Sequence, residues 1–233
     1  MDFEENLSGL EERIGYVFKD KSLLKSALTH SSFANEMKIN KWEDYQRLEY
    51  LGDAVLELVS SEFLYNNNPD MKEGSMSKTR ASMVCEPSLA ICAKDMDLSR
   101  FVLLGKGEEN SGGRYRNSIL SDVFEAIIGA IYIDGGFDKA KKHIERFVLE
   151  GVNERQLFID SKSILQEMIQ ASHSSVLRYE LIGESGPEHE KEFEMALYIN
   201  DELVSKAKGR NKKETEQKAA YEAIKILKKG NPS

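Results

Sequence analysis

Two pairs of acidic residues stand out because each lies in an otherwise apolar segment with helical periodicity. Glu49 and Asp53 are four residues apart, so a helix would place both side chains on one face, a single turn apart. Asp122 and Glu125 are three residues apart in a segment that is apolar on most sides. Like charges at these spacings repel, and ionised groups in a buried helix need partners. A hard divalent cation would satisfy both pairs, and two solvated acids on an exposed helix face are the alternative.

A further acid, Glu73, lies in a turn that is followed by serine residues able to cap a helix. If the carboxylates of both helices and of this helix start converge, they form a site of oxygen ligands suited to magnesium. The spacing alone does not require that they converge.

The elements that carry these acids are predicted to be helices. Residues up to about 150 form one helical segment after another, separated by proline and glycine positions, with little of the alternation typical of strands. Gly52 lies inside an apolar helix, where glycine costs about 1 kcal/mol relative to alanine. It would allow a second backbone to approach closely, either at a symmetric subunit interface or within the core. The residues that would pack there are Tyr50, Leu51, Val55, Phe63 and Leu64.

The pattern changes after a predicted linker at residues 151–160, where helical periodicity is lost. The expected order is then a helix over 161–171, strands over 178–183, 192–199 and 203–208, and a helix over 211–228. We therefore predict a mainly α domain over residues 1–150 and a small α+β domain, with the order α-β-β-β-α, over residues 161–229.

The charge is distributed unevenly along the chain. The net charge of −8 argues at first against a nucleic-acid partner. Between residues 205 and 230, however, there are nine basic and three acidic residues, a difference of +6. A phosphate backbone would respond to this local charge rather than to the average. A solvated lysine-rich helix is the alternative interpretation.

The composition, with 40% hydrophobic and 31% charged residues, is typical of a soluble globular protein. No apolar run approaches the roughly 20 residues needed to cross a bilayer. The acidic N-terminus lacks the basic and then apolar pattern of a secretory signal. We expect a cytoplasmic protein without a membrane partner.

The segments around the acids, taken together, resemble ribonuclease III, the double-strand-specific endoribonuclease. The resemblance is carried, in this order, by residues 15–24, 27–32, 46–56, 73–74 and 118–126. Its extent over more than a hundred residues makes it far more specific than a lone Leu-Gly-Asp. It implies a mainly helical endonuclease domain at the N-terminal end.

The C-terminal order of elements resembles the double-stranded-RNA-binding domain, which recognises the shape, the 2′-hydroxyls and the phosphates of an A-form duplex. The match is carried by the outer face of the first helix, by residues 186–189 and by residues 208–214. Lysines at a helix N-terminus suit phosphate oxygens. The RNA-binding residues that the resemblance implies are Ser163, Gln166, Glu167, Gln170, His189, Lys208, Asn211, Lys212 and Lys213.

The resemblance further implies a hydrolase that cuts double-stranded RNA with a metal-activated water and leaves 5′-phosphate and 3′-hydroxyl ends. The implied metal site consists of Glu49, Asp53, Asp122 and Glu125, with Glu73 nearby. Asp53 and Glu125 are the foremost catalytic candidates. Mg²⁺ is the expected ion, and Mn²⁺ should substitute for it because both ions accept octahedral oxygen sites.

Members of the family work as homodimers whose two sites cut opposite strands, and they process ribosomal RNA precursors, messenger RNA and other structured transcripts. The family often has Glu at the position of Gln46, whose amide cannot supply that charge. We expect Gln46 to contact RNA or the partner subunit instead. Asn211 stands where serine is common in the family. The alternative function is a non-catalytic double-stranded-RNA-binding protein, which the loss of any of the four acids would favour; all four are present.

Overall fold

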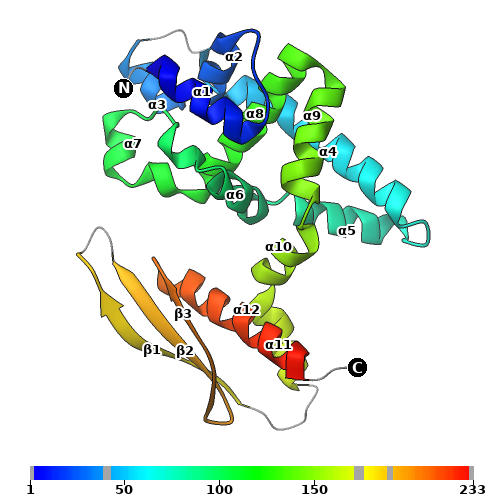
Figure 1. The fold of residues 1–233 in the computed structure, drawn as a ribbon, viewed down its shortest axis with the longest axis vertical. Coiled ribbons are helices and arrows are strands. Elements are labelled where there is room, and N and C mark those ends of the chain that lie inside the picture. The colour runs from blue at the N-terminus through cyan, green and yellow to red at the C-terminus, as the bar shows by residue number, and fades with distance from the viewer. Residues whose placement is uncertain (1–2, 39–42, 171–175, 188–190, 231–233) are drawn as a thin grey trace. The chain divides into compact units, whose positions relative to one another are not determined.

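The protein is seen here in a computed structural model that describes residues 3–38, 43–170, 176–187 and 191–230. The chain divides into two compact units, Met1–Val152 and Asn153–Ser233. The first unit is built of helices, and the second combines helices with a sheet (Figure 1). Among the described residues, none of the helices combines the length and the apolar character that a bilayer crossing requires.

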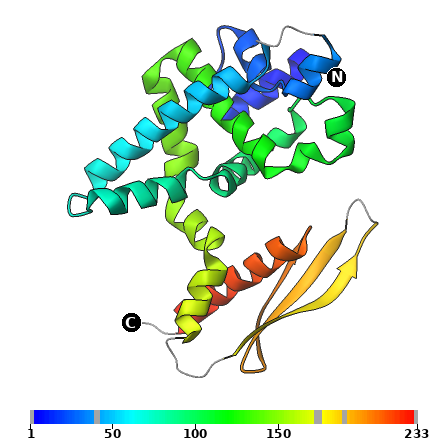
Figure 2. The same ribbon diagram turned by 180° about the vertical axis from the view of Figure 1, so that it is seen from behind.

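The first unit consists of helices joined by short turns (Figures 1 and 2). Its α-helices are α1 (Phe3–Ile14), α2 (Lys21–Ala27), α3 (Ser31–Glu36), α4 (Gln46–Asn67), α5 (Glu73–Met83), α6 (Glu86–Asp95), α7 (Lys106–Asn110), α8 (Asn117–Gly135) and α9 (Phe137–Ile144). The short helical turns are η2 (Leu98–Arg100), η3 (Gly113–Tyr115) and η4 (Glu145–Leu149). Within the described part of this unit, strand-like pairing is limited to one bridge between Thr29 and Leu103. The predicted low sheet content is therefore confirmed.

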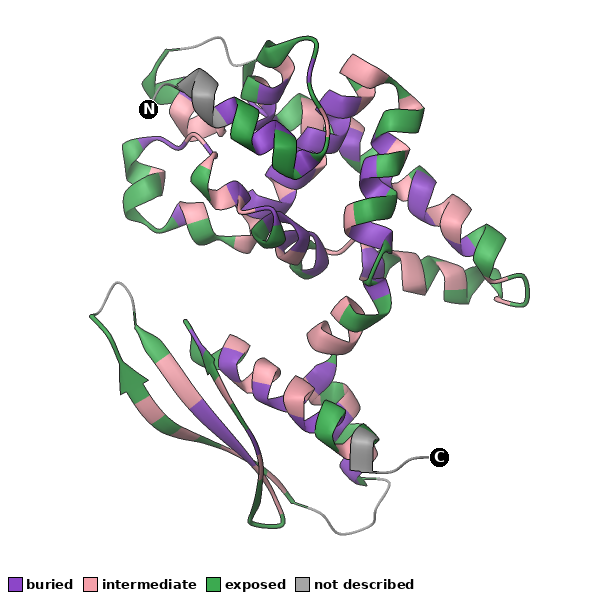
Figure 3. Cartoon of the chain, viewed as in Figure 1, coloured by how far each residue is buried: buried purple, intermediate pink, exposed green. Residues whose placement is uncertain are grey.

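Helix α8 forms the centre of the first unit. Eleven of its 19 residues are buried, and they are apolar apart from Ser121 (Figure 3). A helix that is apolar on most sides is stable only in an interior, where burial of apolar area supplies the main favourable free energy. Helix α8 ends at Gly135 and is followed by the capping residue Gly136, whose φ of 83° is accessible to glycine without strain. Helix α4 lies along α8 and makes its most extensive contact with it.

The second unit contains α10 (Val152–Ile159), which begins at the unit boundary, α11 (Ser161–Gln170), β1 (Leu177–Ser185), β2 (Glu192–Ile199), β3 (Glu202–Gly209) and α12 (Lys212–Gly230). The strands form one antiparallel sheet in the order β1-β2-β3. Leu197 of β2 pairs with Tyr179 of β1 and with Ser205 of β3. One face of the sheet packs against α11 and α12 through a core that includes Leu165, Leu197 and Ile224.

The predicted fold class is confirmed, and the predicted strands agree with the observed ones to within two residues. Strand β2 has the predicted bounds, since its apolar alternation is the strongest of the three. The segment 151–160, for which we predicted a linker because helical periodicity is lost there, contains α10. This helix has no strongly apolar face, so its sequence lacks the periodic signal that identifies the other helices.

Candidate functional site

The crossing of α4 and α8 is made by backbone atoms. A Cβ atom on Gly52 would lie 1.8 Å from the carbonyl oxygen of Glu125, and a Cβ on Gly129 would lie 2.1 Å from that of Leu48. Side chains at either position would push the helices apart. Of the two explanations for Gly52, close approach within the core is therefore correct, and approach by a second subunit is not needed.

This crossing brings one acid of α4 to the two acids of α8. Glu49, Asp122 and Glu125 each offer a carboxylate oxygen, and these three oxygens lie within 4.8 Å of one another. All three side chains are partly buried. The predicted convergence of carboxylates from two helices thus holds for these three residues.

Burial and mutual repulsion make these carboxylates hard to ionise. Desolvation and the charges of Asp122 and Asp53 raise the pKa of Glu49 to about 7. Desolvation and the charges of Asp53 and Glu49 raise the pKa of Glu125 to about 8. Desolvation also raises the pKa of Asp122. Clustered acids held in this way favour the approach of a cation.

Asp53 and Glu73 lie outside this group of three. Asp53 is exposed, one turn beyond Glu49 on α4, although its charge acts on both glutamates. Glu73 begins α5 and accepts a hydrogen bond from Ser77. Helix α4 has 22 residues and is therefore about 33 Å long. Because α5 runs back from the C-terminal end of α4, Glu73 lies far from Glu49 within the chain.

The turn between α4 and α5 and the ion pair between Arg80 of α5 and Glu57 of α4 fix this arrangement. Glu73 precedes Arg80 by two turns of α5 and so lies still closer to the C-terminal end of α4. The expectation that Glu73 lies near the other acids is wrong for a single chain. Gln46 is the exposed first residue of α4, and its role remains a prediction.

Two residues next to the site were missed by the sequence analysis. Tyr45 is buried, and its hydroxyl donates a hydrogen bond to Oδ2 of Asp122 over 3.1 Å. Asp44 is also buried, accepts a hydrogen bond from the amide of Gln46, and contributes to the raised pKa of Glu49. The only available signal was their position directly before the segment 46–56.

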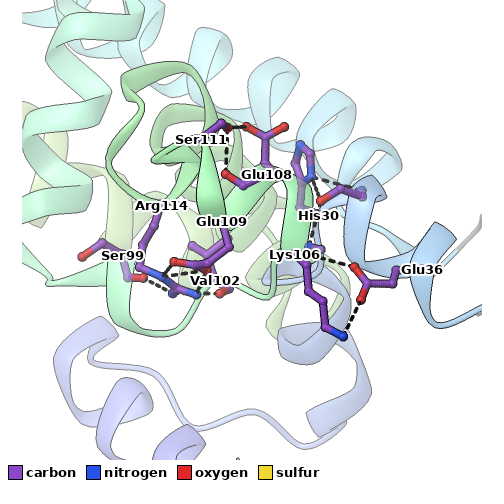
Figure 4. A network of polar contacts seen from close by, with 11 residues as sticks. His30, Glu36, Ser99, Val102, Lys106, Glu108, Glu109, Ser111 and Arg114 are labelled. Atoms are coloured by element: carbon purple, nitrogen blue, oxygen red, sulfur yellow. Dashed lines mark hydrogen bonds and ion pairs between the residues drawn. The ribbon is translucent and has the colours of Figure 1, made fainter. Parts of the chain in front are cut away.

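Polar contacts fix the segments around this region (Figure 4). Nδ1 of His30 lies 2.7 Å from the hydroxyl of Ser32, which accepts a hydrogen bond from the amide of Gly105. Arg114 pairs with Glu109 and donates to two carbonyl oxygens in the turn that contains η2. These contacts hold α3, α7 and η3 together, and so they support the segment that leads to α8.

The donor set of the acidic group fits a hard divalent cation. Three carboxylates from two rigid helices provide oxygen ligands at a spacing that one ion can bridge, and no soft sulfur ligand is among them. Each added negative charge raises the cost of leaving the group without a counter-ion. Metal binding is therefore the chemistry that this arrangement supports.

The second unit presents the predicted RNA-binding residues on its surface. On α11, the side chains that are exposed include Ser163, Gln166, Glu167 and Gln170. Near the start of α12, the exposed residues are Lys208, Asn211, Lys212 and Lys213. His189 lies outside the described residues.

Asn211 caps α12. Its side-chain oxygen accepts the amide of Glu214, and its side-chain nitrogen donates to the carboxylate of the same residue. Lys212 lies 3.3 Å from a carboxylate oxygen of Glu184, and Lys208 lies 3.9 Å from those of Glu192 and Glu194. Lys208 and Lys212 are thus held in weak surface ion pairs.

Comparisons with known proteins agree with both units. Residues 20–152 match the family model described as Ribonuclease-III-like, and residues 161–227 match that of the Double-stranded RNA binding motif. Ribonuclease 3 of Listeria monocytogenes is 46% identical over 220 residues, which are 94% of this chain and 96% of that protein. Ribonuclease 3 of Caldanaerobacter subterraneus is 48% identical over 228 residues, covering 95% of this chain and 98% of that protein.

Among solved structures, the nuclease domain of ribonuclease III from Campylobacter jejuni superposes with a TM-score of 0.57 at 46% identity. It covers 61% of this chain and 95% of that one. The match therefore extends from the sequence to the helical architecture that positions the acids. With its helical nuclease unit and its C-terminal RNA-binding motif, the chain belongs to the ribonuclease III family of double-stranded-RNA endonucleases.

Proposed function

We propose that Glu49, Asp53, Asp122 and Glu125 form the catalytic centre and bind Mg²⁺, with Mn²⁺ able to substitute. The observation that carries this proposal is the group of three carboxylates whose oxygens lie within 4.8 Å of one another. When bound, the metal activates a water for attack on phosphorus and stabilises the departing 3′ oxygen. Hydrolysis then leaves 5′-phosphate and 3′-hydroxyl ends.

The four acidic residues have different proposed roles. Glu49 and Asp122, from two helices, would hold the ion, and Asp53 and Glu125 are the foremost catalytic candidates. Glu125 is the more buried of these two, so water is restricted on its side of the site. Asp53 is exposed, so its carboxylate is accessible to an RNA substrate.

The RNA is held by the second unit. The exposed face of α11 offers hydroxyl and amide groups of a kind that suits the 2′-hydroxyls of a minor groove. Lys212 and Lys213, at the N-terminus of α12, suit the phosphates of the backbone. This mode of recognition reads the shape of the duplex more than its sequence, which fits a processing enzyme for ribosomal RNA precursors, messenger RNA and other structured transcripts in the cytoplasm.

The proposed assembly is a homodimer with one site for each strand. The solved nuclease domain of ribonuclease III from Campylobacter jejuni shows structural flexibility in a region involved in dimer formation. In this chain, Tyr50, Leu58 and Tyr65 of α4 are 80%, 58% and 74% exposed. At 3.6 residues per turn, these three fall within about 80° of one another around the helix. An exposed apolar stripe of this kind suits a two-fold interface.

The test is the cleavage of a long labelled RNA duplex in the presence of Mg²⁺, with single-stranded RNA of the same sequence as substrate control. The unaltered protein should cut only the duplex. Glu125→Ala should bind the duplex without cutting it, while Glu12→Ala, which removes an exposed acid from α1, should cut normally. Cleavage by Glu125→Ala at the normal rate would refute the proposed centre, and binding without cleavage by the unaltered protein would favour a non-catalytic role.

A further inference from the structure

Tyr45 is hydrogen-bonded to both helices that carry the acidic group. Its side-chain hydroxyl donates to Oδ2 of Asp122 on α8 over 3.1 Å. Its main-chain carbonyl accepts the amide of Glu49 on α4 over 2.9 Å. A single residue therefore fixes the start of one helix and the side chain of the other.

Tyr45 is itself firmly held. Only 4% of the residue is exposed, and its amide donates to the carbonyl of Thr29 over 2.9 Å. Its ring packs against the ring of His30, with 5.6 Å between the centroids. Thr29 in turn forms the bridge to Leu103. The hydroxyl consequently reaches Asp122 from a support with little freedom to move.

The chemistry of this contact suits the second layer of a metal site. An aspartate side chain can rotate, and each rotation presents different lone pairs to an ion. A hydrogen bond to one oxygen fixes the rotation and leaves the remaining lone pairs available. A hydroxyl group achieves this without adding positive charge, whereas a lysine or arginine at the same place would compete with the ion.

We propose that Tyr45 is a positioning residue of the metal centre, which it serves by fixing the carboxylate of Asp122 relative to Glu49. This inference rests on the proposed function of the acidic group. The competing explanation is that the hydroxyl merely satisfies its own hydrogen-bonding need, as buried tyrosines usually do. Tyr45→Phe separates the two explanations because it keeps the ring and removes only the hydroxyl.

The chain offers a matched control on the same helix. The hydroxyl of Tyr16 donates to Oδ2 of Asp134 over 2.6 Å. Asp134 lies near the C-terminal end of α8, twelve residues after Asp122 and about 18 Å along the helix. Tyr16→Phe therefore removes the same type of hydrogen bond from α8 without touching the acidic group.

The first measurement is calorimetric titration of Mn²⁺ into the metal-free, full-length protein without RNA. The second is the Mg²⁺ concentration that gives half the maximal single-turnover cleavage rate. Tyr45→Phe should weaken Mn²⁺ binding and raise the Mg²⁺ midpoint by on the order of 10-fold, the usual effect of losing an outer hydrogen bond to a ligand. Tyr16→Phe should change neither quantity, even if it lowers the midpoint of thermal unfolding. Tyr45→Phe with the Mn²⁺ affinity and Mg²⁺ midpoint of the unaltered protein would overturn the inference.

A double-variant cycle tests whether Tyr45 acts through Asp122. In an Asp122→Asn background, adding Tyr45→Phe should weaken Mn²⁺ binding by less than twofold. An undiminished effect in that background would overturn the inference. Glu125→Gln distinguishes a failure of the inference about Tyr45 from a failure of the proposed metal site. If Glu125→Gln binds Mn²⁺ like the unaltered protein, the acidic group is not the metal site, and the role of Tyr45 falls with it. If Glu125→Gln weakens Mn²⁺ binding and Tyr45→Phe does not, only the proposed role of Tyr45 is wrong.

Discussion

The Cα atom of Gly52 faces the carbonyl oxygen of Glu125 so closely that a Cβ atom there would lie 1.8 Å from it. The contact joins α4 to α8 at the acidic group itself, since Glu49 lies one turn before Gly52. The distance between the proposed ligands is therefore set by two backbones in contact.

Replacing Gly52 with alanine should damage both the fold and the metal site. The gain in helix propensity is about 1 kcal/mol, but separation of two packed helices costs more. We expect a net loss of about 2 kcal/mol in the free energy of unfolding, measured by urea denaturation. Mn²⁺ affinity should fall with it, because α4 and α8 move apart.

Gly9→Ala provides the control for this prediction. Gly9 lies in α1, and a Cβ atom there would meet nothing within 4 Å. This substitution should leave Mn²⁺ affinity unchanged and stabilise the protein by up to about 1 kcal/mol. Equal effects of the two substitutions would contradict the importance of the α4–α8 contact.

Metal affinity should increase as the pH rises from about 6 to about 8.5. The folded-state pKa of Glu49 is about 7 and that of Glu125 about 8, and only the ionised forms bind a cation well. Calorimetric titration of Mn²⁺ in buffers with different ionisation enthalpies should also detect proton release on binding at pH 7. A Kd that is constant across this range would show that neither glutamate is protonated in the metal-free protein.

Glu125→Gln should stabilise the metal-free protein at pH 8. Because the folded-state pKa of Glu125 is raised to about 8 from an ordinary value of 4.5, the folded protein binds more protons than the unfolded chain between these limits. Stability consequently falls as the pH rises through this window. Allowing for solvent screening, we expect the substitution to recover about 1 kcal/mol in the presence of EDTA.

The same comparison at pH 4 should give nearly equal stabilities, because the carboxyl group is then protonated in both states. Saturating Mg²⁺ should abolish or reverse the advantage of the variant at pH 8, since glutamine is a weaker ligand. An unaltered protein that is more stable than the variant at pH 8 without metal would contradict the repulsion inferred within the group.

Duplex binding should depend on salt through the lysines at the start of α12. Lys212→Gln together with Lys213→Gln should lower the slope of log affinity against log salt by about 2, and weaken binding about tenfold or more at low salt. Lys225→Gln is the control, since Lys225 is exposed on the same helix about 18 Å further along. If Lys225→Gln lowers the salt slope by as much as each of the other two substitutions does, the helix acts only through its total charge.

Much of the fold follows from periodicity in the sequence. Phe193, Met195 and Leu197 of β2 alternate with other residues and α8 is apolar on most sides, so both elements were predicted from local pattern. Helix α10 was not, because its formation depends on tertiary packing that the pattern does not encode. Gly52 signalled a close approach, but its partner Gly129 is 77 positions away, and no local pattern joins the two.

The acidic group was predicted only in part, because local pattern does not show which helices cross. Spacing within a helix placed Asp122 beside Glu125, and the crossing of two helices then added Glu49. Glu73 was misplaced, because the length and direction of α4 and α5 decide its position and the motif does not. Tyr45 was missed because a tyrosine before a helix has no distinctive chemistry until its partner on α8 is known.

The glycine crossing also has a consequence for how this sequence can vary. Where side chains separate two helices, every change of residue size shifts the elements that they hold apart. At Gly52 and Gly129 there is no side chain to change, so the spacing at this crossing does not depend on the size of a residue placed between α4 and α8. The two glycines thereby set the distance between Glu49 and the acids of α8 through main-chain contact.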